Sequence, residues 1–215
     1  MCASLPVSCE DPHPAETRSW PSGTAFAVDD LPVSEAEIDL AMLAVHLIDP
    51  GYTDRHKRRL ALTNLVLPRA VGRLMAGEGR EAARREIEAL HAKAVAGELT
   101  GPPGPDGAYG EILDGPWTKL GMLTWARAFE LPPGEWSEVI EEIGHFLIFR
   151  VLERRDGVVP AATQFKIDVQ RIPYMDPDPT AIDRRYDSTR LTIVDPEWLE
   201  IFPEQFLYRM GVRDS

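Results

Sequence analysis

Apolar residues recur at helical spacing in three segments of the first half of the chain. In residues 35–48 the apolar positions that share one helical face are Ile38, Met42, Val45 and Ile48. Residues 53–76 and 80–96 repeat this spacing, and breakers rich in glycine or proline separate the segments. A stripe of this width is typical of a helix that packs one side on a core. The pattern therefore predicts three helical segments, the second of which Pro68 either kinks or divides in two.

The first of these helices has a start signal. Ser34 precedes it and Glu37 follows three residues later, which is the spacing of a capping box. In that motif the serine hydroxyl accepts a hydrogen bond from the Glu37 amide, and the Glu37 carboxylate reaches back to the amide of the capping residue. We expect both bonds at the start of this helix.

Alternation with a period of two appears in the second half of the chain. Residues 163–170 place Phe165, Ile167 and Val169 on one side, with lysine, aspartate and glutamine on the other. This pattern predicts a half-buried strand. The run HFLIFRVL at 145–152 is rich in β-branched and aromatic residues and predicts another strand. Shorter strands are expected at 25–28 and 190–194.

The order of these elements predicts an α+β fold organised in four regions. Residues 1–23 contain several prolines and few periodic apolar positions, so we expect a flexible tether. Residues 24–97 form a helical N-terminal region, and residues 98–175 form a small antiparallel sheet with flanking helices, entered through a Gly/Pro-rich loop over 97–117. Residues 176–215 are expected to pack back on the core through Phe202, Phe206, Tyr208 and Met210.

Composition narrows the range of partners. The chain has 215 residues, 44% hydrophobic content and a formal net charge of −12. It is long enough to bury a core, and its acidity disfavours nucleic acid or an anionic bilayer surface as a partner. It lacks a run of about eighteen apolar residues, so no transmembrane span is expected.

The cysteines, histidines and clustered acidic residues do not form a recognisable metal or catalytic motif. Cys2 and Cys9 both lie near the N-terminus, and Met-Cys-Ala-Ser resembles the mature start of a bacterial lipoprotein with Cys2 as the lipidated residue. The alternative is a disordered tail with two ordinary thiols, or with a disulfide between them. The histidines lack metal-ligand spacing. The acidic loop over 176–187 lacks the glycine and closing glutamate of a calcium loop. We expect no metal and no cofactor.

Several short motifs follow one another between residues 119 and 155: Leu120-Gly121, Ala128-Phe129-Glu130-Leu131, Pro133-Gly134-Glu135-Trp136-Ser137, Gly144 and Ile148-Phe149-Arg150-Val151-Leu152-Glu153-Arg154. In order and spacing they resemble the C-terminal half of the parvulin family of peptidyl-prolyl isomerases. The earlier segment VSEAEID at 33–39 is similar to the opening of SurA/PrsA-like foldases, where it precedes a helical chaperone domain. The resemblance implies a helical chaperone-like region followed by a parvulin-like domain.

The resemblance also implies a site. Parvulins hold the proline ring in an apolar pocket beside a polar cluster that includes two histidines. The positions of this chain that match the apolar pocket are Leu120, Met122, Trp125, Phe129, Leu131 and Leu147. The histidine positions are degenerate, because Leu147 occupies the second one, two residues after His145, and Asn64 occupies the first. His145 and Asn64 are therefore the candidate catalytic residues.

Asn64 lies in a segment that we also predict to be helical. If that segment is helical, the first strand of the parvulin sheet is missing before the helix. Residues 165–172 would then replace it, and we expect them to pair antiparallel with residues 146–152. This pairing is a hypothesis from the pattern alone.

The implied function is a peptidyl-prolyl cis-trans isomerase or foldase that assists exported proteins and binds unfolded or proline-containing polypeptides. Because the histidine cluster is broken, the alternative is a non-catalytic chaperone or a binding module of a surface or secretion assembly. Trp117, Trp125 and Trp136 suit binding of apolar chains, although tryptophans are also frequent in cores. The expected location is periplasmic or otherwise extracytoplasmic, with Cys2 as the membrane anchor if the lipoprotein interpretation holds.

Overall fold

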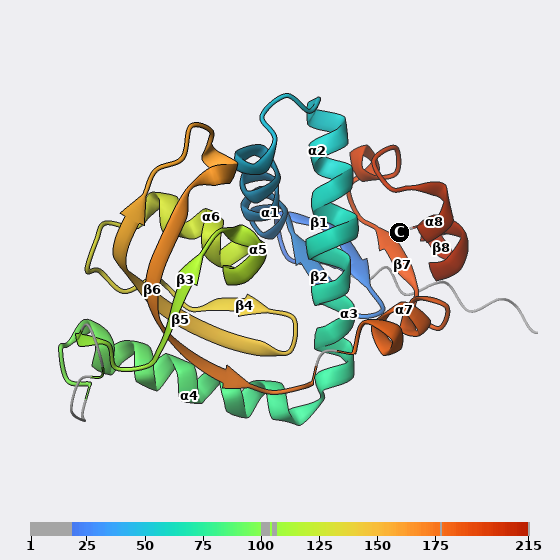
Figure 1. Ribbon diagram of the computed structural model, residues 1–215. Helices are drawn as coiled ribbons and strands as arrows, with labels where there is room; N and C mark the ends of the chain where they lie inside the picture. The colour runs from blue at the N-terminus through green and yellow to red at the C-terminus, as the bar shows by residue number, and fades with distance from the viewer. Residues whose placement is uncertain (1–18, 100–103, 105–106, 177, 215) are drawn as a thin grey trace, which may run out of the picture.

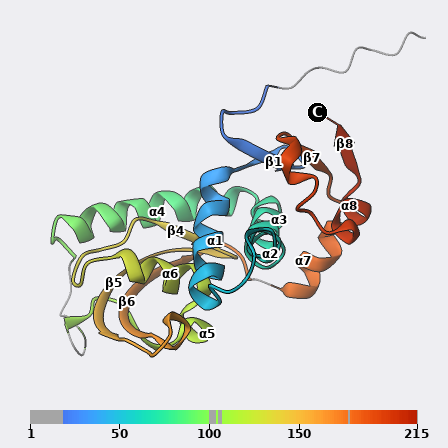
Figure 2. The same ribbon diagram turned by 90° about the horizontal axis from the view of Figure 1, so that it is seen from above.

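The structure is a computed structural model that describes residues 19–99, 104, 107–176 and 178–214. Its helices and its two four-stranded sheets confirm the predicted α+β class. Figures 1 and 2 show the sheets toward opposite ends of the molecule, with three helices between them: α1 (Glu35–Ile48), α2 (Asp54–Ala61) and α3 (Leu67–Ala76). Cys2 and Cys9 lie outside the described residues. Within the described part, no helix is both long and apolar enough to cross a bilayer.

The first sheet has the order β3-β6-β5-β4, and all its neighbours are antiparallel. Its strands are β3 (Glu111–Gly115), β4 (Ile140–Glu142), β5 (His145–Arg155) and β6 (Gln164–Pro173). β5 and β6 pair from Phe146 opposite Ile172 to Val151 opposite Ile167. The predicted antiparallel pairing of residues 146–152 with residues 165–172 is therefore confirmed.

β3 corrects the expectation of a loop over residues 97–117. Its sequence, Glu-Ile-Leu-Asp-Gly, has two adjacent apolar residues and no alternation, so it carries no local strand signal. It pairs along its length with β6, from Glu111 opposite Val169 to Gly115 opposite Phe165. The strand thus forms because β6 offers it a hydrogen-bonding edge, which is a non-local cause.

Residues from both ends of the described chain form the second sheet, whose order is β2-β1-β7-β8. Its strands are β1 (Thr24–Val28), β2 (Leu31–Ser34), β7 (Leu191–Ile193) and β8 (Val212–Asp214). β1 is antiparallel to both β2 and β7, and β8 runs parallel to β7. The regions 24–97 and 176–215 therefore share a sheet.

The C-terminal segment adds α7 (Pro179–Tyr186), a short helix at Pro196–Trp198 and α8 (Glu204–Met210). Three of the apolar residues expected in the core are buried there: Phe202, Phe206 and Met210. Tyr208 is not, because its side chain is 90% exposed. It lies two residues after Phe206 on α8, and positions two apart on a helix point in different directions.

The second predicted helical segment continues through a π-helical turn. α2 ends at Ala61, Leu62–Val66 form the turn, and α3 begins at Leu67. Pro68 is the second residue of α3, where the hydrogen-bond pattern changes from π to α. A proline lacks an amide donor and is accommodated most readily at such a change.

β5 and β6 separate two apolar layers. Leu147, Phe149 and Val151 belong to the main core, together with α1 and with α6 (Met122–Glu130), which follows the short helix α5 (Trp117–Leu120). Phe146 and Ile148 belong to a second cluster with α4 (Glu78–Val95). The first sheet is therefore covered on both faces, and its polar residues need partners.

The start of α1 has one of the two predicted capping bonds. The Ser34 hydroxyl accepts a hydrogen bond from the Glu37 amide at 3.3 Å. The Glu37 carboxylate does not reach back, because it pairs at 2.8 Å with both Arg69 and Arg73 of α3. Arg73 also pairs at 2.8 Å with Glu141 of β4. A chain of charged groups thus joins α1 and α3 to the first sheet.

Candidate functional site

A cavity of about 320 Å³ lies at the N-terminal end of α6, where α3, α7 and the turn between β4 and β5 approach it. Its lining residues are Leu65, Arg69, Met122, Leu123, Glu142, Ile143 and Pro179. Most of these side chains are apolar, and the volume is at the small end of ligand pockets in proteins. Met122 is the predicted pocket residue that lines it. We call this cavity the Met122 cavity.

Two charged side chains, Arg69 and Glu142, are among the residues that line the Met122 cavity. The Thr124 hydroxyl donates a hydrogen bond to Glu142 Oε1 at 2.6 Å, and His145 Nε2 lies 3.5 Å from Glu142 Oε2. Burial raises the pKa of the Glu142 carboxyl, but the contacts with His145 and Thr124 outweigh burial and hold the pKa below its ordinary value. A carboxylate, a hydroxyl and an imidazole therefore lie together beside an apolar cavity.

The β4–β5 hairpin brings two of these groups together. Glu142 ends β4 and lies directly opposite His145, the first residue of β5. The His145 side chain is 18% exposed, and its Nε2 atom has no hydrogen-bond partner of good geometry among the described residues. His145 thus belongs to the polar cluster through Glu142, and not through a second histidine.

Three predicted pocket residues lie in the core. Leu120, Trp125 and Leu147 are 3%, 0% and 1% exposed. Trp125 Nε1 donates a hydrogen bond to the Thr163 carbonyl at 3.0 Å, which holds the indole ring inside the protein. These residues do not line the Met122 cavity, because their side chains pack into the main core instead.

Phe129 and Leu131 are also placed differently from the expectation. Phe129 packs edge-on against Trp125 and Phe165, with ring centroids 4.8 and 5.1 Å apart. The Arg154 guanidinium covers the Phe129 ring at 4.8 Å. Leu131 is partly buried against the same core. The C-terminal end of α6 therefore anchors the helix to the sheet, whereas its N-terminal end lines the cavity.

Asn64 does not take part in the site. It is exposed on the π-helical turn, and its side-chain oxygen accepts a hydrogen bond from the Thr63 hydroxyl at 3.4 Å. The resemblance put it where the parvulin family has a strand, but the segment is helical, as its apolar spacing predicts. β6 takes the place beside β5, so Asn64 cannot reach the polar cluster along a strand.

Sequence reasoning missed several residues of the site. Thr124 and Glu142 lie within the parvulin-like run, but no family motif marks them. Leu65 and Pro179 come from segments distant in sequence, and only tertiary packing brings them to Met122. A carboxylate directly before the turn into β5 was the one local signal for Glu142.

The acidic loop has a structural explanation. Arg209 pairs with Asp183 at 2.9 Å and with Asp187 at 2.7 Å, so these carboxylates join α7 to α8. In the part of the chain that the structure describes, no three His, Cys, Asp or Glu side chains are grouped to hold a metal ion.

No family model, curated protein or solved structure matches the chain. Prolyl isomerisation breaks no covalent bond, and it requires a grip on the ring and polar groups around a twisted amide. The Met122 cavity offers mostly apolar walls together with one carboxylate and one guanidinium.

Proposed function

We propose that the protein is a parvulin-like peptidyl-prolyl isomerase or foldase that assists exported proteins, with the Met122 cavity as its proline site. The observation that carries the proposal is the pairing of β6 with β5. In this proposal β6 stands in for the first strand of the family beside the closing strand. The Met122 cavity then lies at the start of the helix that follows the Leu120-Gly121 motif.

The cavity residues have roles that fit this reaction. The barrier to rotation about a peptide bond is about 18–20 kcal/mol because of amide resonance, and it falls when the bond is twisted away from water. The side chains of Leu65, Met122 and Ile143 hold the proline ring. The Glu142 carboxylate, fixed by Thr124, accepts a backbone N–H of the bound chain and keeps the chain in register.

A non-catalytic chaperone is the second candidate, and a specific observation favours it. Leu147 stands in the position of the second histidine and is 1% exposed, so no imidazole faces the substrate from that position. A domain with the cavity and without the histidine pair still binds unfolded or proline-containing polypeptides. The extracytoplasmic location and the lipid anchor at Cys2 remain predictions of the resemblance.

The test is prolyl isomerisation of a short Ala-Pro-Phe peptide, followed by NMR exchange spectroscopy. We expect Met122→Ala to lower kcat/KM about tenfold, because an apolar pocket loses several contacts with the ring. Met75→Ala is the matched control, since Met75 is 38% exposed on α3 and does not line the cavity. Equal turnover in a folded Met122→Ala variant removes the cavity as the proline site.

The same preparation separates the two candidates. A wild-type protein without turnover above background, which still suppresses aggregation of an unfolded client, is a chaperone. In that case we expect Met122→Ala to weaken the suppression and Met75→Ala to leave it unchanged. Absence of both activities contradicts the proposed function.

A further inference from the structure

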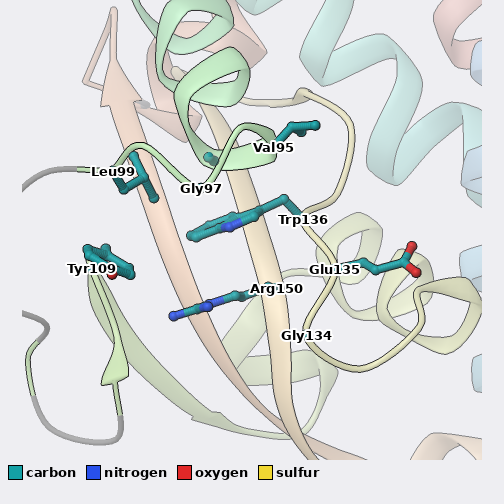
Figure 3. A pocket seen from close by; sticks show the side chains of 9 residues that line it. Val95, Gly97, Leu99, Tyr109, Gly134, Glu135, Trp136 and Arg150 are labelled. Atoms are coloured by element: carbon teal, nitrogen blue, oxygen red, sulfur yellow. The ribbon is translucent and has the colours of Figure 1, made fainter.

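A second cavity, of about 520 Å³, lies on the α4 side of the first sheet. Figure 3 shows the Trp136 ring above the Arg150 guanidinium, and Tyr109 lies beyond the tips of both side chains. The Arg150 Cζ atom lies 5.1 Å from the centroid of the Trp136 ring and 5.5 Å from that of Tyr109. We call this cavity the Arg150 cavity. It shares no lining residue with the Met122 cavity.

Two hydrogen bonds hold the Arg150 guanidinium in place. Its Nε donates to Asp168 Oδ2 at 3.1 Å, and its Nη2 donates to the Gly107 carbonyl at 2.6 Å. Asp168 is fully buried at 0% exposure and also accepts the amides of Tyr109 and Gly110, at 3.0 and 2.9 Å. The orientation of the guanidinium is therefore set before any ligand arrives.

Gly110 is required for this arrangement. A Cβ at this residue would meet the Val169 carbonyl oxygen at 2.2 Å. Glycine lets the backbone lie directly on β6, so the two amides reach the Asp168 carboxylate. A buried aspartate, a glycine and an arginine thus form one hydrogen-bonded network at the base of the cavity.

The remaining polar side-chain groups beside the guanidinium can donate hydrogen bonds, and the Tyr109 hydroxyl can also accept one. Among the described residues, no acceptor is bonded to Arg150 Nη1, Trp136 Nε1 or the Tyr109 hydroxyl. The Tyr109 side chain is 40% exposed, so the cavity is open at this end. The Glu135 side chain points away from Trp136 and Arg150 in Figure 3. A ligand group that contacts both Arg150 Nη1 and Trp136 Nε1 must therefore accept hydrogen bonds, because these two groups can only donate.

The other walls are apolar. Ala94, Val95 and Leu99 line the cavity at the end of α4, and Val95 is 66% exposed. A planar carboxylate matches an arginine edge and an indole N–H. Since the adjoining wall is apolar, the carboxylate must be attached to an apolar group. The end of a polypeptide chain with an apolar last residue has this chemistry.

We propose that the Arg150 cavity binds the C-terminal carboxylate of a polypeptide whose last side chain is apolar. The carboxylate accepts from Arg150 Nη1 and Trp136 Nε1, and the last side chain lies against Val95 and Leu99. The site does not depend on isomerase activity. It gives the protein a second contact with a client chain, one that recognises the end of the chain.

The test uses a fluorescein-labelled peptide, Gly-Ser-Ala-Ser-Ala-Phe, with either a free carboxylate or an amide at its C-terminus. The peptide has no proline. We expect the free acid to bind the full-length protein about tenfold more tightly than the amide, by fluorescence anisotropy, because the amide loses a charge-assisted hydrogen bond. Equal affinity for both peptides, or no saturable binding of either, overturns the proposal.

Variants that keep the rings locate the binding site. Trp136→Phe removes the indole donor, and we expect it to weaken binding of the free acid about fivefold or more. Tyr208→Phe is the control, because that tyrosine is 90% exposed on α8. Met122→Ala is expected to leave binding of this peptide unchanged. A loss of binding in Met122→Ala, with none in Trp136→Phe, places the peptide in the other cavity and overturns the assignment.

Discussion

Gly121 lies against the carboxylate of Glu142. A Cβ on Gly121 would meet Glu142 Oε1 at 2.7 Å, and the residue has a φ of +88°. Gly121 also directly precedes α6, so it sets where that helix begins relative to the β4–β5 hairpin. Glycine alone provides both the space and the left-handed backbone. The Leu-Gly motif found in the sequence therefore has a local reason in the geometry of the Met122 cavity.

We expect Gly121→Ala to lower the free energy of unfolding by about 1–3 kcal/mol, because backbone strain adds to the displacement of Glu142. Gly134→Ala is the matched control, since its φ is +85° and no atom lies within 4 Å of the position of its Cβ. Urea unfolding of the two variants measures the difference. Equal losses in both would mean that the contact with Glu142 contributes nothing.

Periodicity was sufficient to predict β6 as a strand, although its second face is covered as well and Asp168 on that face is 0% exposed. The alternation of Phe165, Ile167 and Val169 predicted β6, and its expected pairing with residues 146–152 is confirmed. β3 was missed because its own sequence does not alternate, and it becomes a strand only through its hydrogen bonds to β6. The helical pattern around Asn64 indicated correctly that this residue does not lie on a strand, and only the family resemblance gave it a place in the site.

The candidate site was predictable only in part. Family motifs led to Met122 and His145, but the same motifs also named Trp125 and Leu147, which are core residues. A motif records which residue types recur and does not separate a pocket wall from a helix anchor. Glu142 and Thr124 become partners through a hairpin and a helix that meet in space, which no local pattern encodes.

Glu141 is the centre of the charge network between the helical region and the first sheet. Arg73 and Arg80 pair with its carboxylate at 2.8 and 2.6 Å, and its side chain is 10% exposed. We expect Glu141→Gln to lower the free energy of unfolding by about 2 kcal/mol, because two largely buried arginines each lose one carboxylate partner, although Arg73 keeps Glu37 and Arg80 keeps Glu81.

The control for Glu141 is an exposed pair of the same residue types. Glu88 pairs with Arg84 at 2.9 Å, and both side chains are 51% exposed. Glu88→Gln is expected to change the stability by less than about 1 kcal/mol. Thermal and urea unfolding give both values. A Glu141→Gln variant as stable as Glu88→Gln would show that the network does not hold the two regions together.

The stability of the protein is expected to fall in acid. Burial raises the pKa of Glu141, but hydrogen bonds and charges from Arg80 and Arg73 outweigh it and hold the pKa below 4.5. The folded state then binds this proton less readily than the unfolded state does. The stabilisation is present above the unfolded pKa and is lost as the pH falls through the lower pKa of the folded state.

Urea midpoints between neutral pH and pH 3 test this linkage. The wild-type protein is expected to lose stability as the pH falls from about 5, because the carboxylates that are paired in the folded state take up protons. The difference in stability between wild type and Glu141→Gln should shrink over the same range. A difference that stays constant with pH would exclude Glu141 as the group that titrates.

Asp168 is expected to be the most sensitive carboxylate of the first sheet. It is 0% exposed and holds Arg150 together with the amides of Tyr109 and Gly110. Asp168→Asn keeps the shape but removes the charge, and one side-chain oxygen becomes an amide donor. We expect a loss of about 3 kcal/mol in the free energy of unfolding, because Arg150, whose side chain is 20% exposed, loses its counter-charge and a backbone amide loses its acceptor.

Asp156→Asn is the matched exposed change. Asp156 pairs with Arg154 at 2.6 Å, but its side chain is 67% exposed, so we expect an effect below about 1 kcal/mol.

The two variants also separate stability from binding at the Arg150 cavity. In a folded Asp168→Asn protein the guanidinium is no longer fixed between Trp136 and Tyr109, so the preference for a peptide with a free carboxylate should disappear. Asp156→Asn should keep that preference. An Asp168→Asn protein that still prefers the free acid would show that Arg150 needs no fixed orientation to bind it.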